Sequence, residues 1–264
     1  MTIAVLIKPV HDNTKLKFQD GKPQTANAPL MMNPFDEYAL ESALRVKSVI
    51  PTESVTVIAF STQAGKEVLK KAIAAGADAG LLINHEGLEN TDANAVSALF
   101  AAVVKSLDAC HLVLCGQSTL DDASGQMCSL LAEHLGWHGV SGVKAVEKNE
   151  GAENSLKISR ETDYASREVL AVSLPMILGV AKCDYELRSS NIKGVMKANK
   201  TNIPIQTIQD YEFSVDQLLT AIQKTTVTKR WQRPEKTAGT IVKGLSPDEA
   251  AKGIVQYLQA QQLI

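Results

Sequence analysis

Short apolar runs alternate with longer helical patterns through the first half of the chain, and this alternation limits the fold more strongly than any other feature. The runs at 3–7, 55–60, 81–83 and 112–115 are rich in Val, Ile and Leu, as are strands that are buried on both faces of a sheet. Strands separated by helices imply right-handed crossover connections and a parallel sheet. The sequence therefore predicts an α/β fold, with helices flanking a twisted parallel sheet.

The helices of this alternation carry recognisable end signals. Asn33 is the expected N-cap of a helix that starts at Pro34 and runs to about Val49, with acidic residues in its first turn. A second helix is predicted from about 64 to 75 and ends at Gly76, and a third is predicted from 91 to 107. The polar segment before the first helix contains Asp20-Gly21, a typical turn sequence.

The stretch 111–137 combines a strand, a polar loop and a helix, which is a geometry suited to binding an anion. The strand ends near Gly116, and the helical pattern begins at Gly125. The first turn of a helix has unpaired N–H donors and a positive dipole end, so a phosphate placed there is stabilised. The loop is neither a glycine-rich dinucleotide motif nor a Walker motif, so an ordinary connection with Ser124 as N-cap remains the alternative.

The second half of the chain has a different pattern. Strands at 154–160 and 168–172 are predicted to form a hairpin, followed by a short strand at 176–180. The segment 184–201 has the composition of an exposed basic loop, although apolar Val195 and Met196 inside it require something to cover them. We expect an α/β domain over residues 1–224, which contains this loop.

The C-terminal part is predicted to be an arm. A helix over 214–224 closes the domain, and residues 225–240 have no regular pattern. Ser246 and Glu249 form a capping box with Pro247 at the first turn, which opens a last helix that ends near Ala260. Residues 225–264 are therefore expected to pack on the body of the protein or on a partner subunit.

Composition excludes several classes of function. The formal net charge of −2 gives no reason to expect nucleic acid or an anionic membrane as a partner, and no apolar run is long enough to span a bilayer. The four cysteines have no metal-binding spacing and are interpreted as reduced residues of a cytosolic protein. The five histidines show no metal or catalytic pattern. Adjacent Asp121 and Asp122 suit hydrogen bonding to a ribose better than acid–base catalysis. The chain thus offers a nucleotide-binding site without a reaction centre.

An ordered series of short motifs resembles the beta subunit of electron transfer flavoproteins. The series is formed by Met32–Glu37, Gly76–Asp78, Gly116-Gln117, Asp121-Asp122, Gly125–Met127, Leu174-Pro175, Val195–Ala198 with Lys200, and Lys236–Gly239. Each motif alone is weak, but their order is specific, and the resemblance covers essentially the whole chain.

The resemblance implies a Rossmann-like domain that binds an adenine nucleotide and pairs with an alpha subunit, which carries most of the FAD contacts. The beta subunit would hold a structural AMP. The heterodimer would pass single electrons from flavin dehydrogenases to a membrane quinone oxidoreductase. It would be an electron carrier rather than an enzyme, without metal, nucleic acid or membrane insertion, in the cytoplasm or, in a eukaryote, the mitochondrial matrix.

The resemblance also implies two sets of site residues. The AMP contacts would come from strand ends, a helix start and the loop before another helix, namely Leu6, Asn33, Pro34, Phe35, Asp36, Phe60, Asp121, Asp122, Ser124, Gly125, Gln126, Met127, Cys128 and Ser129. The segment around 192–200 would recognise the partner dehydrogenase, with Ile192 as its apolar anchor beside Val195, Met196, Lys197 and Lys200. The C-terminal arm would wrap the alpha subunit.

Three departures from the family pattern indicate a divergent branch. The loop between Gln117 and Gly125 is shorter than usual, Tyr164-Ala165-Ser166 replaces an expected Gly-Gly turn, and an aromatic near Asn13 is missing. Electron-bifurcating members bind a second FAD in place of AMP. Ser124-Gly125-Gln126 is closer to the AMP type, and the second FAD remains the alternative. A stand-alone nucleotide-binding stress or sensor protein is a further alternative, although its usual phosphate-binding motifs are missing.

Overall fold

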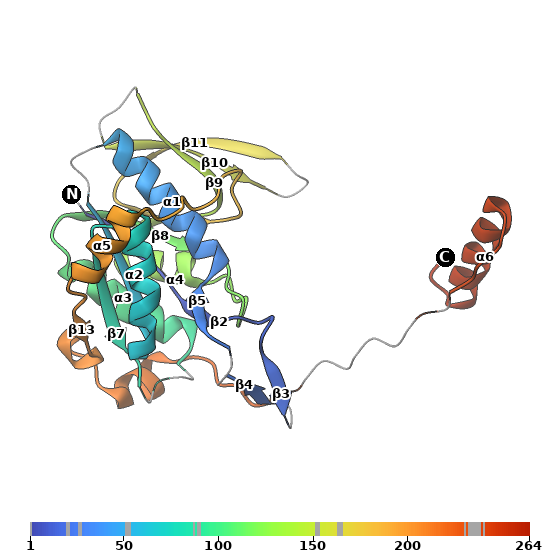
Figure 1. Cartoon of the computed structure of the whole chain (residues 1–264), viewed down its shortest axis with the longest axis horizontal. Coiled ribbons are helices and arrows are strands. Elements are labelled where there is room, and N and C mark those ends of the chain that lie inside the picture. The colour runs from blue at the N-terminus through green and yellow to red at the C-terminus, as the bar shows by residue number, and fades with distance from the viewer. Residues whose placement is uncertain are drawn as a thin grey trace. The chain divides into compact units, whose positions relative to one another are not determined.

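The computed structural model describes residues 2–19, 22–25, 28–50, 54–86, 88, 91–150, 154–162, 166–229, 231, 239 and 241–264. The chain divides into two compact units, residues 1–230 and residues 231–264. The first unit contains the sheet and its helices (Figure 1).

The first unit is built on a nine-stranded sheet within the described residues. In spatial order its strands are β11 (Arg167–Ser173), β10 (Ser155–Glu161), β9 (His138–Lys148), β12 (Met176–Val180), β8 (Cys110–Gly116), β1 (Thr2–Leu6), β6 (Ser54–Ser61), β7 (Ala79–Asn84) and β13 (Ile205–Gln206). All neighbours from β9 to β13 are parallel, whereas β10 is antiparallel to both β9 and β11. The predicted parallel α/β sheet with a small antiparallel hairpin is confirmed.

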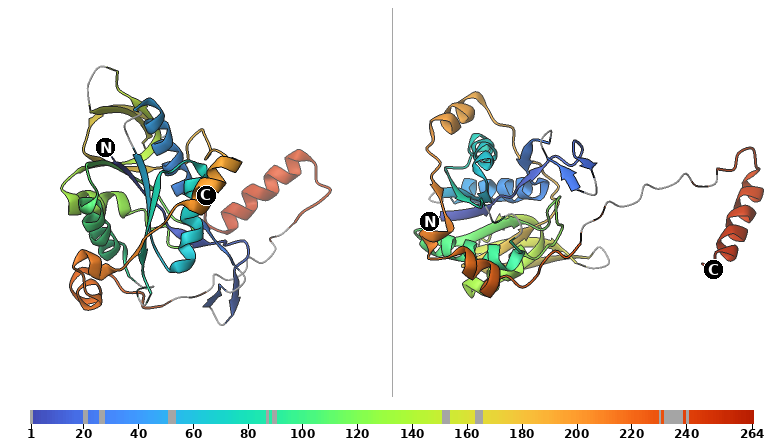
Figure 2. Two further views of the ribbon diagram at one scale, coloured as in Figure 1. Left: turned by 60° about the vertical axis from the view of Figure 1, so that its left-hand side comes forward. Right: turned by 90° about the horizontal axis from the view of Figure 1, so that it is seen from below.

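Helices cover both faces of the sheet, and alternate residues of β1 face the two layers. Ile3 and Val5 pack into the core under α1 (Pro34–Val49), α2 (Lys66–Ala75) and α5 (Ile192–Lys200). Ala4 and Leu6 pack into the core under α3 (Ala93–Ser106) and α4 (Met127–Leu135). The two helix layers are visible in Figure 2. A strand buried on both faces in this way has a continuous apolar sequence, which is why β1 was recognisable from the sequence.

Shorter elements surround this framework. Strands β2 (Pro9–His11) and β5 (Leu30–Met32) pair antiparallel, as do β3 (Lys17–Gln19) and β4 (Lys22–Gln24). The predicted turn at Asp20-Gly21 lies outside the described residues. Two 3₁₀ helices, η1 (Gln63–Gly65) and η3 (Ile208–Tyr211), and the π-helix η4 (Gln217–Ile222) complete the described part of this unit.

The structure corrects four sequence-based expectations about the elements. Strand β9 has no counterpart among the predictions, because three glycine or serine residues interrupt its apolar pattern. The helix predicted from Gly125 begins at Met127. The expected loop 184–201 contains helix α5, whose N-cap Asn191 accepts a hydrogen bond from Gly194 N. The expected α-helix over 214–224 is reduced to the π-helix η4, which follows a turn at Ser214.

The second unit contains helix α6 (Pro247–Ala260). Ser246 and Glu249 form the predicted capping box at its start. None of the residues of α6 is buried, and the exposed side chains of this unit include Ile241, Val242, Ile254, Val255 and Tyr257. Among the described residues, no helix is long and apolar enough to cross a membrane.

Candidate functional site

The direction of strand connection reverses at β1. The chain runs from β1 to β6 and β7 on one side, and later returns to β8 on the other side. In open α/β sheets, ligands bind outside the carboxyl ends of the strands at such a reversal. Here that position lies between Lys8, two residues beyond β1, and Gly116 at the end of β8. The helix α1 and the loop 117–126 surround it.

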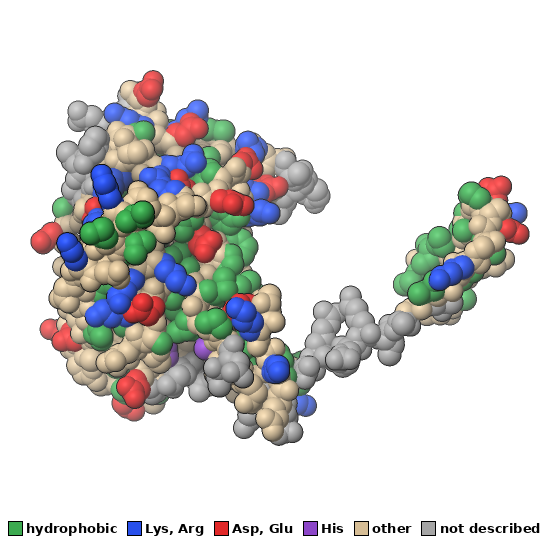
Figure 3. Space-filling view, in the orientation of Figure 1, with side chains coloured by type: hydrophobic (Ala, Val, Ile, Leu, Met, Phe, Trp, Pro, Cys, Tyr) green, Lys and Arg blue, Asp and Glu red, His purple; other side chains and the backbone are tan. Residues whose placement is uncertain are grey.

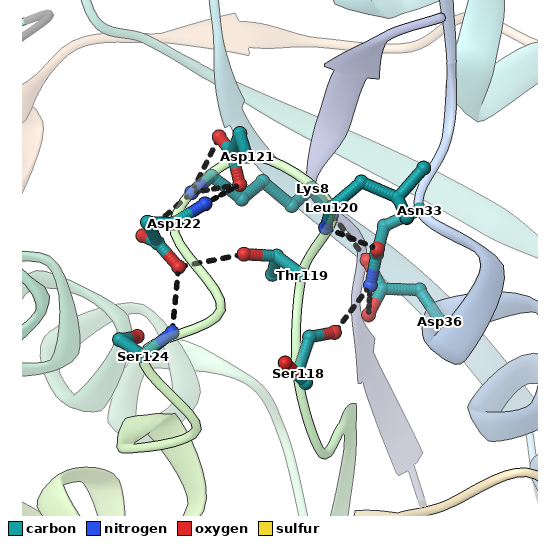
Figure 4. A network of polar contacts seen from close by, with 9 residues as sticks. All are labelled: Lys8, Asn33, Asp36, Ser118, Thr119, Leu120, Asp121, Asp122 and Ser124. Carbon is teal, nitrogen blue, oxygen red and sulfur yellow. Dashed lines mark hydrogen bonds and ion pairs between the residues drawn. The ribbon is translucent and has the colours of Figure 1, made fainter. Parts of the chain in front are cut away.

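A buried carboxylate, Asp36, joins the three elements that meet at this position (Figure 4). Its Oδ2 accepts a hydrogen bond from Lys8 N at 2.7 Å, and its Oδ1 accepts one from Gly116 N at 3.1 Å. The Asn33 amide donates to the same Oδ1 at 3.0 Å. Asp36, in the first turn of α1, thereby holds the carboxyl ends of β1 and β8 in fixed positions. Burial raises the pKa of Asp36 to about 7, against the lowering effect of these three donors.

Asn33 is the N-cap residue of α1, but its side chain does not cap the helix. Its amide nitrogen donates to Ser118 O at 2.8 Å, and its amide oxygen accepts from Leu120 N at 3.2 Å. The expected capping role is therefore wrong for the side chain. The buried amide instead holds the loop that follows β8, because both of its polar atoms are engaged by that loop and its nitrogen also donates to Asp36.

The loop 117–126 is closed by Lys8, which sequence reasoning missed. Its ammonium lies 2.8 Å from Asp121 Oδ2 and 3.0 Å from Asp122 Oδ2. Burial lowers the pKa of Lys8, but the hydrogen bonds and charges of the two aspartates outweigh it and leave the pKa raised. Its position just after a predicted central strand was the one signal that could have identified it.

Asp122 organises the second half of the loop. Its Oδ1 accepts from Thr119 Oγ1 at 2.7 Å and from Ser124 N at 3.0 Å. Burial raises the pKa of Asp122, but these two donors and Lys8 outweigh it and lower the pKa to about 2. The chain then turns through Ala123 and Gly125, both with positive φ (51° and 65°), to reach α4. The side chains of Asp121 and Asp122 are thus engaged with protein cations and donors, while remaining half exposed.

The start of α4 has no side-chain cap. Its N-cap residue is Gln126 and not Ser124, and no side-chain hydrogen bond closes this end. Gly125, Gln126 and Ser129 are exposed, whereas Cys128 is buried. A Cβ at Gly125 would contact only Gln117 O among the described residues, at 3.4 Å. The first turn of α4 therefore has no side-chain acceptor for its backbone donors, and it lies beside the loop that Lys8 closes.

The apolar residues predicted for the site differ in how they are placed. Leu6 is buried in the core beneath the sheet edge, so its side chain supports the site from below. Phe60, at the carboxyl end of β6, is half-buried, and its ring centroid lies 5.2 Å from that of His85. Phe35 packs against Gly116, where a Cβ would lie 2.8 Å from Phe35 Cβ and 2.3 Å from Asp36 Oδ1. Gly116 is therefore required by close packing.

The segment predicted to recognise a dehydrogenase forms helix α5. Ile192, Val195 and Met196 are exposed, with Ile192 81% accessible, and their spacing places them along one side of the helix. Ala198 is buried on the other side, and a Cβ at Gly194 would lie 2.2 Å from Ala74 O of α2. Lys197 donates to Ala77 O at 3.0 Å, so its ammonium is directed to the turn that follows α2. Lys200 is exposed at the last turn.

The remaining features give no indication of a second site of this kind. In the described part of the chain, no group of three or more His, Cys, Asp or Glu is arranged to hold a metal ion. A small cavity of about 10 Å³ lies at the opposite edge of the sheet near Thr2, and a groove of about 190 Å³ crosses the strands β9 to β11.

Comparisons with known proteins agree with this geometry. The family model described as electron transfer flavoprotein domain matches residues 24–210. The electron transfer flavoprotein subunit beta of Bradyrhizobium diazoefficiens is 31% identical, over 85% of this chain and 89% of its own. The subunit of the same name from Mycobacterium bovis is 28% identical, over 99% of both chains. The caffeyl-CoA reductase–Etf complex subunit CarD of Acetobacterium woodii is 29% identical over the full length of both. The chain therefore belongs to the electron transfer flavoprotein family and is similar to its beta subunits.

Proposed function

We propose that this chain is the beta subunit of a heterodimeric electron transfer flavoprotein, and that it holds AMP at the start of α4. FAD would be bound mainly by an alpha subunit. The pair would carry electrons from a flavin dehydrogenase to a quinone oxidoreductase in the cytoplasm, and this chain would supply no catalytic residue. The observation that supports AMP is the uncapped, exposed first turn of α4, located at the strand reversal between β1 and β8.

The residues of the site suit an adenosine monophosphate. The phosphate would lie on the backbone N–H groups of Gln126 to Ser129, where the helix dipole favours an anion. The Lys8 ammonium offsets part of the negative charge of Asp121 and Asp122, which would otherwise repel a phosphate nearby. Both carboxylates are half exposed, and the lone pairs that the protein contacts leave would accept hydrogen bonds from ribose hydroxyls. Half-buried Phe60 would contact the adenine.

The second unit supports an alpha-subunit partner. Apolar side chains gather along α6 (Figure 3). In this helix, Ile254 and Tyr257 are about 60% exposed. Residues three apart lie on the same side of a helix. An apolar helix side that its own unit leaves uncovered requires a contact elsewhere. We propose that residues 225–264 of this chain pack on the alpha subunit.

The nucleotide proposal is tested by denaturing the purified heterodimer and counting the released cofactors. One FAD and one AMP per heterodimer support the proposal. Two FAD and no AMP would replace it with the bifurcating alternative, in which a second FAD occupies this site. The relative from a caffeyl-CoA reductase complex makes that count necessary. A protein that carries an adenine nucleotide but no flavin, and that needs no partner, would support a stand-alone nucleotide-binding sensor.

A glycine pair gives a matched variant test. Gly125 and Gly136 both have positive φ (65° and 67°) and flank opposite ends of α4, and no described neighbour of Gly136 lies within 4 Å of the position that an added methyl group would take. Replacing either by Ala introduces a similar backbone strain of about 1 kcal/mol. We expect Gly125→Ala to lose AMP, because the methyl enters the phosphate position, and Gly136→Ala to retain it. Equal AMP content in both variants would place the nucleotide elsewhere.

A further inference from the structure

Two buried thiols lie beside each other beneath the loop 117–126. Cys115 is the penultimate residue of β8 and Cys128 lies in the first turn of α4, so the two bracket this loop. Their residues are 3% and 4% exposed. Each thiol directs its S–H toward a carbonyl of β12: Cys115 Sγ lies 3.8 Å from Leu178 O, and Cys128 Sγ lies 3.9 Å from Ile177 O. The proposed nucleotide site uses the backbone of Cys128 and neither sulfur.

A glycine of β12 creates the space that brings the sulfurs together. Gly179 is the register partner of Cys115, and a Cβ at Gly179 would lie 3.1 Å from Cys128 Cβ and 3.4 Å from Cys128 Sγ. The Cys128 side chain therefore rests on the sheet where a larger residue would exclude it. Neighbouring strands are about 4.8 Å apart, so a side chain above Gly179 lies next to that of Cys115.

The surroundings make the two thiols chemically unequal. The hydrogen bond with Cys115 lowers the pKa of Cys128 to about 7, together with donors from Ser141 and the backbone of Gly179 and Val140, although burial opposes them. The start of a helix also favours a thiolate. The same hydrogen bond, and then burial, raise the pKa of Cys115. Cys128 is therefore assigned as the nucleophile, because it lies in the first turn of α4, and Cys115 is the thiol available to resolve an oxidised partner.

We propose that Cys115 and Cys128 form a redox-active dithiol that a peroxide converts into an intrachain disulfide. The Cys128 thiolate attacks one oxygen of hydrogen peroxide, the O–O bond breaks, and hydroxide leaves, which gives a sulfenic acid. The Cys115 sulfur then attacks Cys128 Sγ, the S–S bond forms, and the S–O bond breaks with loss of water. The two thiols lose two electrons, and the peroxide is reduced to two waters. Such reversible disulfides are the kind expected in a reducing compartment.

The other two cysteines are placed differently and serve as internal controls. Cys110 lies at the opposite end of β8, in register with Thr2. Cys183 packs in the core on the other face of the sheet and donates to Ala181 O at 3.4 Å. Neither lies against the loop 117–126.

The test is oxidation of the purified full-length protein with hydrogen peroxide, followed by thiol counting in denaturant. We expect two of the four thiols to be lost and to return with dithiothreitol. Cleavage before Asp121 or Asp122 separates the two cysteines, so mass spectrometry should find their peptides joined by a disulfide. The rate of thiol loss should rise only about tenfold between about pH 6 and pH 8, against about a hundredfold for a thiol of ordinary pKa.

Variants identify the partners. Cys115→Ser and Cys128→Ser should each prevent the linked peptide, whereas Cys110→Ala and Cys183→Ser should leave it unchanged. Mass spectrometry of the peptides from the natural protein needs no variant. It therefore shows whether Cys115 and Cys128 form the disulfide even if a variant fails to fold. Loss of no thiol, further oxidation of Cys128 without a linked peptide, or a disulfide to Cys110 or Cys183 would each overturn the proposal.

Discussion

At the scale of single residues, one buried carboxylate determines how the site is assembled. Asp36 binds Lys8 N, Gly116 N and the Asn33 amide, so residues from β1, β8 and α1 depend on one side chain. Asn33 extends the same connection to Ser118 and Leu120 in the loop. No other side chain can replace this carboxylate equally. The NH₂ group of an asparagine at this position would face one of the three N–H donors, which would then have no acceptor.

We expect Asp36→Asn to destabilise the protein by about 1–3 kcal/mol, because one N–H is left without an acceptor. The measurement is urea unfolding, with Asp184→Asn as the control, since the Asp184 side chain is 86% exposed and its nearest cation, Arg167, is 3.8 Å away. An effect of Asp36→Asn no larger than that of Asp184→Asn would contradict the assigned role.

The pH dependence of Asp36 has a definite sign. Its pKa in the folded state is about 7, above the usual 3.8, so the folded protein holds this proton more tightly than the unfolded chain. The resulting stability is present in full below about pH 4 and is lost as the pH rises to about 7. The difference in stability between the natural protein and Asp36→Asn should therefore shrink over this range. A difference that stays constant over this range would show that Asp36 is ionised throughout.

At the scale of elements, α5 has one side against α2 and another facing solvent. Gly194 permits the close approach to α2, and Ile192, Val195 and Met196 are exposed. The preceding segment is tied to α1, because Arg188 donates to Glu41 at 2.8 and 2.9 Å and Tyr185 shares a 2.7 Å hydrogen bond with Ser42. The apolar side of α5 is thereby held in a fixed direction, although no residue of that side contributes to the core.

Gly194→Ala should destabilise the protein by about 1–3 kcal/mol, because the added methyl overlaps Ala74 O at 2.2 Å and the two helices must separate. Gly253→Ala in α6 is the matched control, since no described neighbour lies within 4 Å of its Cβ position and alanine favours a helix. Both changes are compared by urea unfolding. Equal stabilities would show that α5 does not pack closely on α2.

Ile192→Ala tests the proposed recognition role of α5. The side chain is 81% exposed, so we expect little change in stability and no change in flavin content. Electron transfer from the partner dehydrogenase should slow, because an exposed apolar anchor is the kind of residue that dominates a small interface. Val169→Ala, at a 55% exposed position of β11, is the control. Unchanged rates for Ile192→Ala would remove the recognition assignment.

At the scale of the whole molecule, the two units differ in the way they are stabilised. The unit 1–230 has its own core on both faces of the sheet, whereas no residue of α6 is buried. A helix of this length is marginal without packing. The unit 231–264 therefore needs contacts outside itself for its stability, and the proposal assigns these contacts to the alpha subunit.

Ile254→Glu should weaken association with the alpha subunit by at least about tenfold, equivalent to about 1.4 kcal/mol, because it places a charge on the apolar side of α6. Gln256→Glu adds the same charge at an exposed position on another side of the helix and should have little effect. Binding is measured with purified subunits, and the unfolding of the unit 1–230 should be unchanged in both variants. Equal weakening by the two variants would indicate a general charge effect.

The local pattern of the sequence determined the elements with strong periodicity. Strands that are buried on both faces are apolar throughout, and this pattern predicted β1, β6, β7, β8 and β12. Pro and acidic residues in the first turn predicted the helices α1 and α6. The family resemblance was found from the order of short motifs along the chain. Related proteins inherit this order, so it can be recognised before the fold is known.

Only the tertiary structure decided how distant residues combine. Lys8 and Asp121 are 113 residues apart, and Gly116 and Asp36 are 80 apart, so no local pattern indicates that they meet. β9 and α5 were missed for a related reason: their pattern is weak, and they are stabilised by pairing with β12 and packing on α2. Local preferences are worth fractions of a kcal/mol per residue, whereas pairing and burial contribute more, and these depend on which segments the fold brings together.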